Sequence, residues 1–405
     1  MTRRFSQITI AGLVGLVAAL SLVGIAQAAT EKVLYSFSGG ADGKLPEAGL
    51  IFDTGGNLYG TTFEGGSAGF GSVFKLSPNP GGTWSESVIY SFQLGSGGTG
   101  PIGSLVIDHA GNLYGTASGG GDGGEGTVFE VSPNGDGTWT ETTIHTFFCC
   151  SDGSGSYANL IFDAAGNLYG TTRNGGSFDG GVVFELTPAA GGNWSEGVIY
   201  NFPLNASGGG YGSQGGLVID STGNLYGTTQ FAGTADDGAA FELSPSNGSW
   251  TVNVLHNFTG PDGANSRAGM IVGKSGALYG TTFTGGAEKC ACGTVFRLKR
   301  SSGGGWKEQV VHSFAGAPAS GPTAPLISDS EDNLYGTTYD SDKQVDGTVF
   351  ELNLTTGVYS VLHTFGGADG SGPLGGLVLD SAGNLYGTTS LGGASGWGVV
   401  FEISP

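Results

Sequence analysis

One phrase, close to Asp-x-x-Gly-Asn-Leu-Tyr-Gly-Thr-Thr, occurs seven times in this chain and constrains its fold more than any other feature. Successive copies are separated by 51 to 57 residues. A fixed period of this length indicates a repeat architecture, in which each repeat is one supersecondary unit and neighbouring units bury a continuous core. The tyrosines of the seven copies are Tyr59, Tyr114, Tyr169, Tyr226, Tyr279, Tyr335 and Tyr386.

Each repeat contains four short runs with the composition of β-strands. In the first repeat they span residues 48–53, 57–62, 73–76 and 88–92, and they are rich in β-branched and aromatic residues. Gly, Asn, Asp or Pro bound the runs, and no helical periodicity is sustained. The 82 glycines recur at fixed offsets between apolar runs, so they mark turns. We therefore expect an all-β protein.

The order of the runs predicts a blade of four antiparallel strands. Asp-x-x-Gly-Asn between the first two runs favours a tight hairpin turn, because Asp bonds the backbone two residues on and Gly and Asn tolerate positive φ. Four-stranded units at this period are typical of β-propellers. The small residue that opens each first run suits a strand crowded at the axis, and the bulky Trp and Phe suit the outer strand.

The ends of the repeat array favour a closed propeller over a linear solenoid. The last repeat stops after its third run, at residues 400–403, and a matching fourth run lies at residues 33–37. If these segments pair, the ring closes without an exposed edge strand, whereas a solenoid gains nothing from this arrangement. We predict a single seven-bladed β-propeller of four-stranded antiparallel blades over residues 29–405, closed by the N-terminal strand pairing with the last blade.

Residues 1–28 differ from the repeats. Arg3 and Arg4 precede an apolar stretch over residues 8–25, and Ala-Gln-Ala follows at residues 26–28. A basic start, an apolar core and an Ala-x-Ala site are typical of a secretory signal peptide. We expect cleavage and a secreted, periplasmic or cell-surface protein, with no membrane span after cleavage. Retention of the segment as an anchor is the alternative.

The formal net charge of −20, from 34 acidic and 14 basic residues, limits the possible partners. Nucleic acid is not expected, because phosphate binding needs a basic surface. The acidity keeps a glycine-rich exported domain soluble. We expect a monomer without a cofactor.

The repeated phrase also carries a family resemblance. Its GNLYGTT core is followed by Gly-Gly and then by Gly-x-Val-Phe-x-Leu, and the match covers residues 31–405. In these residues the chain resembles the GloVer-type tandem-repeat family. The resemblance implies an exported bacterial protein with a β-propeller-like fold and no established reaction. The fifth repeat departs most, with Gly273 for Asp and Ala277 for Asn, so its first hairpin turn is expected to differ.

Histidine and aspartate are the first candidates for acid–base or metal chemistry. Four histidines share an outer-strand position with tyrosines of other repeats, which predicts a packed, hydrogen-bonding aromatic rather than a catalytic base. His109 lies in a hairpin turn. One aspartate in each of six repeats could form a ring that holds Ca²⁺, but the turn already explains an aspartate there. The histidines are His145, His256, His312 and His363, and the aspartates are Asp53, Asp108, Asp163, Asp220, Asp329 and Asp380.

Four cysteines occur in two close pairs, Cys149-Cys150 and Cys290-Ala291-Cys292. Export permits disulfides, but adjacent and i, i+2 cysteines close strained rings, so local bridges are not the expected state. A four-thiolate zinc site would require both pairs to converge from separate repeats. We expect structural or incidental cysteines and no metal site.

The candidate binding surface is the loop face, formed by the loops between second and third strands and by the connectors between blades. Loops on a rigid scaffold commonly carry recognition. Aromatic rings suit the C–H faces of sugars, and carboxylates accept sugar hydroxyls. The alternative is that these loops are solvated and their aromatics fold back onto the blades. The candidate ligand-binding residues are Phe63, Phe178, Phe231, Phe283, Tyr339, Trp397, Asp179, Asp236, Asp237 and Asp340. The same face also carries the acidic residues Glu64, Asp122, Glu125, Glu288, Asp342 and Asp346.

No sequence motif assigns a reaction. Paired catalytic carboxylates, a Gly-x-Ser-x-Gly elbow and a His-Glu-x-x-His helix are all absent from the sequence. The leading hypothesis is a non-enzymatic exported propeller that binds an extracellular glycan or protein at its loop face. The alternatives are an extracellular polysaccharide hydrolase or lyase, and a purely structural cell-surface or matrix protein.

Overall fold

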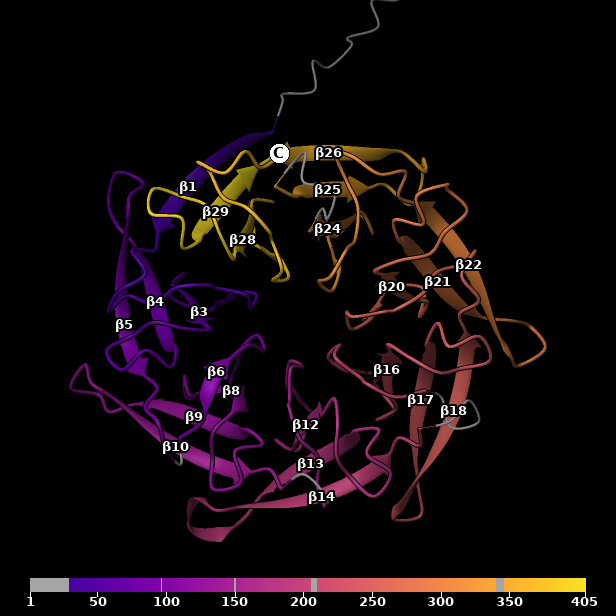
Figure 1. Ribbon diagram of the computed structural model, residues 1–405, viewed down its shortest axis with the longest axis horizontal. Coiled ribbons are helices and arrows are strands. Elements are labelled where there is room, and N and C mark those ends of the chain that lie inside the picture. The colour runs from indigo at the N-terminus through magenta and orange to yellow at the C-terminus, as the bar shows by residue number, and fades with distance from the viewer. Residues whose placement is uncertain (1–28, 96, 149–150, 205–209, 340–345) are drawn as a thin grey trace, which may run out of the picture.

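The chain folds into a ring of seven four-stranded antiparallel sheets around a central axis (Figure 1). The computed structural model describes residues 29–95, 97–148, 151–204, 210–339 and 346–405. The predicted signal peptide, the first cysteine pair, Asp340 and Asp342 lie outside these ranges. The predicted all-β, seven-bladed propeller is confirmed.

The first three blades follow one another along the chain. An additional strand, β6 (Thr99–Pro101), pairs with β8 in the second blade, and a short 3-10 turn, η1 (Ala190–Gly192), interrupts the third. The strands are β2 (Ile51–Phe52), β3 (Leu58–Thr62), β4 (Ser72–Pro78) and β5 (Trp84–Ser91); β7 (Val106–Ile107), β8 (Leu113–Gly119), β9 (Thr127–Pro133) and β10 (Trp139–Thr146); and β11 (Ile161–Phe162), β12 (Leu168–Thr171), β13 (Val182–Pro188) and β14 (Trp194–Asn201).

The next three blades repeat this order from the innermost to the outermost strand. Their strands are β15 (Val218–Ile219), β16 (Leu225–Thr229), β17 (Ala239–Ser246) and β18 (Ser249–Asn257); β19 (Ile271–Val272), β20 (Leu278–Thr282), β21 (Thr294–Arg300) and β22 (Trp306–Ser313); and β23 (Ile327–Ser328), β24 (Leu334–Thr338), β25 (Thr348–Leu352) and β26 (Tyr359–Thr364).

The seventh blade joins the two ends of the repeat array. It contains β27 (Val378–Leu379), β28 (Leu385–Thr389) and β29 (Val399–Ser404), and β1 (Thr30–Ser36) is its outermost strand. β1 pairs antiparallel with β29, with Val33 opposite Phe401. The predicted closure of the ring by the N-terminal strand is confirmed.

Pairs of phenylalanines hold neighbouring blades together. The Phe that follows each outer strand packs edge-on against a Phe of the third strand in the next blade, with ring centroids 4.9 to 5.4 Å apart. Edge-to-face pairs of this kind stabilise a core by roughly 0.5–1.5 kcal/mol beyond the area that they bury. The pairs are Phe37–Phe74, Phe92–Phe129, Phe147–Phe184, Phe202–Phe241, Phe258–Phe296, Phe314–Phe350 and Phe365–Phe401.

The same rings explain the glycine of Leu-Tyr-Gly-Thr-Thr. A Cβ on Gly60 would lie 2.6 Å from the nearest atom of the Phe74 ring, and the equivalent glycines are covered as closely by the equivalent phenylalanines. A contact this short requires the ring or the strand to move. Only glycine therefore fits the second strand at this position.

The conserved aspartate binds the turn and the tyrosine of its own blade. In the first blade Asp53 accepts hydrogen bonds from the backbone of Gly55 and Asn57, from the Asn57 side chain and from the Tyr59 hydroxyl, at 2.7 to 3.0 Å. Burial alone would raise the pKa of Asp53, but these hydrogen bonds hold it below its usual value. Turn chemistry thus accounts for the aspartates, as predicted.

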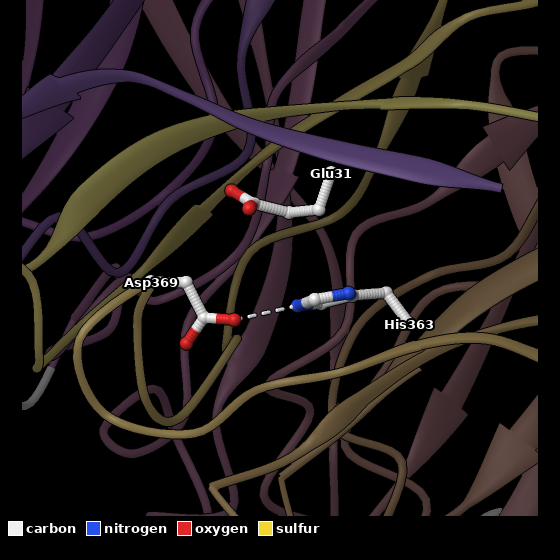
Figure 2. A group of neighbouring side chains, drawn as sticks. All are labelled: Glu31, His363 and Asp369. Carbon is white, nitrogen blue, oxygen red and sulfur yellow. Dashed lines mark hydrogen bonds and ion pairs between the residues drawn. The ribbon is translucent and has the colours of Figure 1, made fainter.

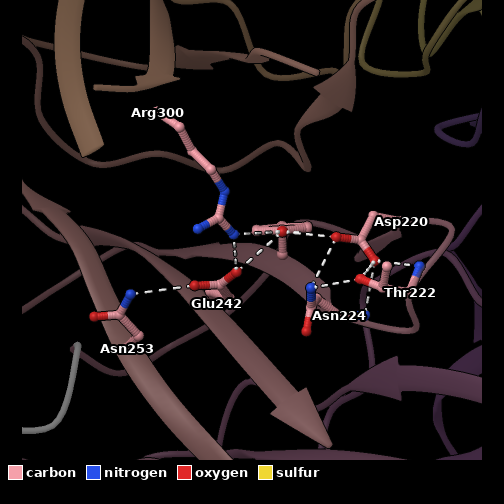
Figure 3. Close-up of polar contacts among 7 residues, drawn as sticks. Asp220, Thr222, Asn224, Glu242, Asn253 and Arg300 are labelled. Atoms are coloured by element: carbon pink, nitrogen blue, oxygen red, sulfur yellow. Dashed lines mark hydrogen bonds and ion pairs between the residues drawn. The ribbon is translucent and has the colours of Figure 1, made fainter. Parts of the chain in front are cut away.

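The fourth blade extends this network to its neighbour (Figure 3). Tyr226 donates to both Asp220 and the buried Glu242, at 2.9 and 3.0 Å. Arg300, on β21 of the fifth blade, forms an ion pair with Glu242 at 2.7 Å. Among the described residues, this is the ion pair that links two blades through an arginine.

The fifth hairpin corrects a prediction. The residue that replaces Asp, Gly273, still donates its N–H to the Ala277 carbonyl at 2.8 Å and accepts from the Gly276 N–H at 2.9 Å. The same two backbone bonds close the first hairpin, between Asp53, Asn57 and Gly56. The turn was expected to differ, but backbone bonds alone maintain it and only the side-chain network is lost.

The second cysteine pair also corrects a prediction. Cys290 and Cys292 form a local disulfide, although local bridges were not expected. Ala291 adopts a left-handed conformation with φ of 51°, and the flanking Cα atoms lie 5.2 Å apart, within the usual range for a disulfide. The tight turn thus brings together cysteines whose spacing alone argued against a bond.

Candidate ligand site at the central axis

The connectors between blades lie beside the loops that follow the second strands, on one face of the ring. Isolated bridges join Lys44 to Glu64 and Ala264 to Thr284, each linking a connector to the segment after Thr-Thr in the same blade. The loop face is therefore arranged as predicted.

Each connector makes the same left-handed bend before it enters its blade. The bend residue has φ between 56° and 71° in all seven connectors. In the first blade its carbonyl, on Leu45, accepts a 2.9 Å hydrogen bond from the Phe63 N–H. The bend residues are Leu45, Gly100, Gly155, Gly212, Asn265, Gly321 and Gly372.

The side chain two residues after each bend lines one cavity at the axis. This axial cavity has a volume of about 200 Å³ and draws its wall from all seven blades. Each of these side chains is partly exposed, whereas the residue that follows it is buried. The seven are Glu47, Ile102, Tyr157, Gln214, Arg267, Thr323 and Leu374.

The wall of the cavity is divided by polarity. Tyr157, Gln214, Arg267 and Thr323 come from four consecutive blades and, with Asn159 of the third blade, form a polar arc. The remaining three blades contribute the apolar Ile102 and Leu374, the carboxylate of Glu47 and the hydroxyl of Ser104, which accepts a hydrogen bond from the Gly49 N–H. A pocket with a hydrocarbon side and convergent polar groups can orient an amphipathic ligand.

Arg267, on the polar side of the cavity, and Arg173, beside the wall residue Tyr157, have no carboxylate partner among the described residues. The Arg267 guanidinium lies 3.6 Å from the centroid of the Phe283 ring, and its Nε is buried without a hydrogen-bond partner. Arg173 lies over the ring of Tyr157, at 5.9 Å. Burial and the charge of Arg173 lower the pKa of Arg267.

A carboxylate occupies the other side. Glu47 stands between Ile102 and Leu374 in the order of the blades, and burial, with the charge of Glu64, raises its pKa. Glu64 itself forms a 2.7 Å ion pair with Lys44. Within the described chain, Glu47 is the carboxylate that lines the cavity.

The structure divides the predicted aromatic residues between two regions. Phe63, Phe283 and Tyr339 directly follow Thr-Thr, and their rings lie against connectors: Phe63 against Gly100, Phe283 against Gly321 and Tyr339 against Gly372. Phe231 lies against Tyr211, with ring centroids 5.4 Å apart. Phe178 and Trp397 lie in the outer loops and are exposed, and Lys44 sits 4.8 Å from the Trp397 ring centroid.

The predicted aspartates lie in the outer loops. Asp179 and Asp236 have positive φ and each accepts a hydrogen bond from a backbone N–H of its own loop. Burial and neighbouring carboxylates raise the pKa of Asp237. None of these three lines the axial cavity, and their role in binding stays a prediction.

The outer rim carries a second group of ionisable side chains, at the seams between blades. In Figure 2, His363 bonds Asp369 at 2.9 Å, and Glu31 of β1 faces them from the next blade. The ligand atoms of this trio, and of His256, Asp262 and Glu308, lie within 4.8 Å of one another, which is within reach of a shared metal ion.

Two observations assign the rim groups a structural role. Asp369 also accepts a 2.8 Å hydrogen bond from the Gly366 N–H, so it closes a turn. At another seam a tyrosine replaces the histidine, and Tyr35 donates to Asp42 at 2.9 Å. A residue interchangeable with tyrosine connects two segments rather than selecting a metal. The prediction of hydrogen-bonded histidines is confirmed for His145, His256 and His363, and His312 instead stacks on Tyr359 at 4.1 Å.

The comparison with known families decides the identity of the repeat. The Gloeobacter/Verrucomicrobia repeat matches residues 20–218 and 212–405. The chain belongs to the Gloeobacter/Verrucomicrobia repeat family. No curated protein is significantly similar to it. Within the described ranges, no helix has the length and apolarity needed to cross a membrane.

Solved structures share the fold of this Gloeobacter/Verrucomicrobia repeat protein at low identity. The extracellular domain of BT4673 of B. thetaiotaomicron, described as a hybrid two component system, aligns with a TM-score of 0.58 and 13% identity over 93% of this chain and 42% of that domain. A protein from Lactobacillus plantarum aligns with a TM-score of 0.52 and 16% identity over 79% of this chain and 84% of its own. The chain thus spans less than half of the first structure, and the likeness supports the propeller fold alone.

The axial residues were not predicted, although the sequence contains a signal for them. Between the connector bend and the small residue that opens each first run, one position holds a different residue in every repeat: Glu, Ile, Tyr, Gln, Arg, Thr and Leu. The residues directly before and after this position are similar in all seven repeats. A position free to vary within an otherwise uniform repeat marks a surface that the fold does not need.

Proposed function

We propose that this protein is a non-enzymatic exported propeller that binds an extracellular glycan, with one end of the glycan in the axial cavity. One observation carries the proposal: seven different side chains, one from each blade, converge on a single cavity while the surrounding framework repeats. A volume of about 200 Å³ is smaller than a drug-sized pocket of about 300–1,000 Å³, so it suits a single sugar ring.

The chemistry of the wall supports a sugar ligand. Tyr157 presents an aromatic surface. Asn159 accepts a hydrogen bond from the Ser104 N–H and Gln214 donates to Gln230, and the remaining hydrogen-bonding capacity of both amides can serve hydroxyls. Ile102 and Leu374 suit the C–H face of a ring. A solvated polar pocket without a hydrocarbon side would lack this match.

Binding is favoured over hydrolysis by the carboxylates. A glycosidase uses two carboxyl groups that flank the scissile bond. Glu47 lines the cavity, whereas Glu64, the nearest carboxylate that influences it, is held by Lys44. Among the described residues, the proposed site therefore offers one free carboxylate rather than a pair.

A glycan array with the exported chain tests the proposal, followed by calorimetry on each hit. The variant Ile102→Trp fills the axial cavity and should abolish binding, whereas Phe178→Ala, in an outer loop, should leave it unchanged. Loss of binding in Phe178→Ala together with unchanged binding in Ile102→Trp would place the site in the outer loops. Release of new reducing ends would establish a hydrolase, and retention of no glycan would refute the proposal.

A further inference from the structure

Arg267 in the wall of the axial cavity and Arg173 beside the wall residue Tyr157 have no carboxylate partner among the described residues. Arg267 lines the cavity from the fifth blade, and Arg173 lies over Tyr157 of the same wall. The chain has 14 basic residues against 34 acidic ones, yet neither arginine forms an ion pair. In a protein this acidic, an unneutralised guanidinium in the cavity wall and a second one beside that wall require an explanation.

Aromatic rings hold the arginines in place without neutralising them. Phe283 covers one face of the Arg267 guanidinium, which leaves its N–H edge for a ligand. The Nε of Arg267 is buried and has no hydrogen-bond partner. The guanidinium as a whole is partly exposed and has no carboxylate partner among the described residues, so an oxyanion in the cavity would neutralise it.

We propose that the axial cavity selects a saccharide end that carries a carboxylate, such as a uronic acid. This inference rests on the proposed glycan-binding function and specifies its ligand class. The planar N–H fork of arginine matches a carboxylate in two parallel hydrogen bonds, which a neutral hydroxyl does not reproduce. An anion beside Arg267 also offsets the unfavourable effect of the Arg173 charge on that guanidinium.

Glu47 favours one orientation of the sugar in the cavity. It comes from the first blade, whereas the arginines come from the third and fifth, and the described structure shows no ion pair between them. The carboxylate of the sugar is therefore expected toward the arginines, with its hydroxyls toward Glu47. A ligand in the opposite orientation would place two carboxylates together.

The test compares ligands that differ only in charge. Affinities are measured by calorimetry for trigalacturonate, for its methyl ester and for a neutral galactose trisaccharide, at two salt concentrations. Oligomers of glucuronate and of mannuronate extend the series. A sulfated galactose trisaccharide tests whether an oxyanion other than a carboxylate is bound. The free acid of at least one uronate should bind at least about tenfold more tightly than its ester, and this preference should weaken as salt increases.

Variants locate the preference. Arg267→Gln should reduce the acid-to-ester ratio to below about threefold, and Arg267→Lys should retain part of it because the charge remains while the fork is lost. If Arg267→Gln fails to fold, Arg173→Gln provides a second measurement of the acid-to-ester ratio. Glu47→Gln should strengthen binding of the acid by removing a like charge. Arg297→Gln, on the outer part of the fifth blade, is the matched control and should change nothing.

The outcomes separate the two proposals. Equal affinity for acid and ester overturns carboxylate selection while the glycan-binding function stands. Binding of the sulfated sugar alone also overturns it, because the selected group is then not a carboxylate. Binding of no saccharide refutes the proposed function and this inference with it.

Discussion

Four glutamates at the seams between blades should make the propeller less stable as pH rises through the weakly acidic range. Burial, with the charge of a neighbouring aspartate, raises the pKa of each of them to about 7, and the Oε1 of each is buried without a hydrogen-bond partner. A protonated glutamate avoids that cost, so folding favours the proton. The four are Glu31, Glu86, Glu196 and Glu308.

The contribution of each glutamate to the free energy of unfolding follows from the size of its pKa shift. For Glu308, a rise from 4.5 to about 7 corresponds to an upper limit of about 3 kcal/mol. Because the side chain is partly exposed, solvent screening reduces this to about 1 kcal/mol. The unfolded chain loses its proton near pH 4.5 and the folded chain near pH 7, so the stabilisation is complete below pH 4.5 and is lost as pH rises to about 7.

The substitution Glu308→Gln keeps the shape of the side chain and removes its charge. Relative to the parent, it should leave the free energy of unfolding nearly unchanged at pH 4 and increase it by about 1 kcal/mol at pH 8. Thermal unfolding followed by circular dichroism, in buffers containing EDTA, measures the difference across the range. Glu331→Gln, in an exposed turn, is the control and should give a flat difference. A flat profile for Glu308→Gln, or one that falls with pH, would refute the reasoning.

Two further substitutions test the framework of the blades, each by chemical or thermal unfolding. Asp380→Ala removes the acceptor of four hydrogen bonds, including that from Tyr386, and should cost about 2–3 kcal/mol; a loss below about 0.5 kcal/mol would contradict the role of the turn. Gly60→Ala places a Cβ against the Phe74 ring and should cost about 1–3 kcal/mol, whereas Gly197→Ala on β14 has open space around its Cβ and should be neutral or slightly stabilising. Equal effects of the two alanines would show that packing at Gly60 is not tight.

The framework could be predicted because it is built from short-range features that occur many times. The turn at Asp53 needs only residues close in sequence, and seven copies make the period unmistakable. The closure by β1 could also be predicted, since the fourth strand missing from the last repeat is present at residues 33–37. Errors arose where the backbone compensates for side chains, as at Gly273, or where one left-handed residue changes the distance between neighbours, as at Ala291.

The axial site could not be assembled from the sequence in the same way. Arg173 and Arg267 are separated by almost two repeats, and the fold brings them near enough for the charge of Arg173 to lower the pKa of Arg267. The role of Phe283 as a ligand contact stays a prediction, and the structure adds that its ring lies 3.6 Å from the Arg267 guanidinium. A local motif cannot show this relationship, because the two residues belong to segments that meet only when the connector folds back beside the second strand.

The geometry of a ring built from copies favours its axis as the place for the proposed binding site. Within the sheets, a substitution must remain compatible with the packing of Phe, Tyr and Trp between neighbouring blades. At the axis one side chain from each blade faces the same cavity, and that position supports no blade-to-blade contact of the core. The seven side chains at this position can therefore differ from one another without changing the repeated framework. Together they form one asymmetric surface, with Arg267 on one side and Glu47 on another.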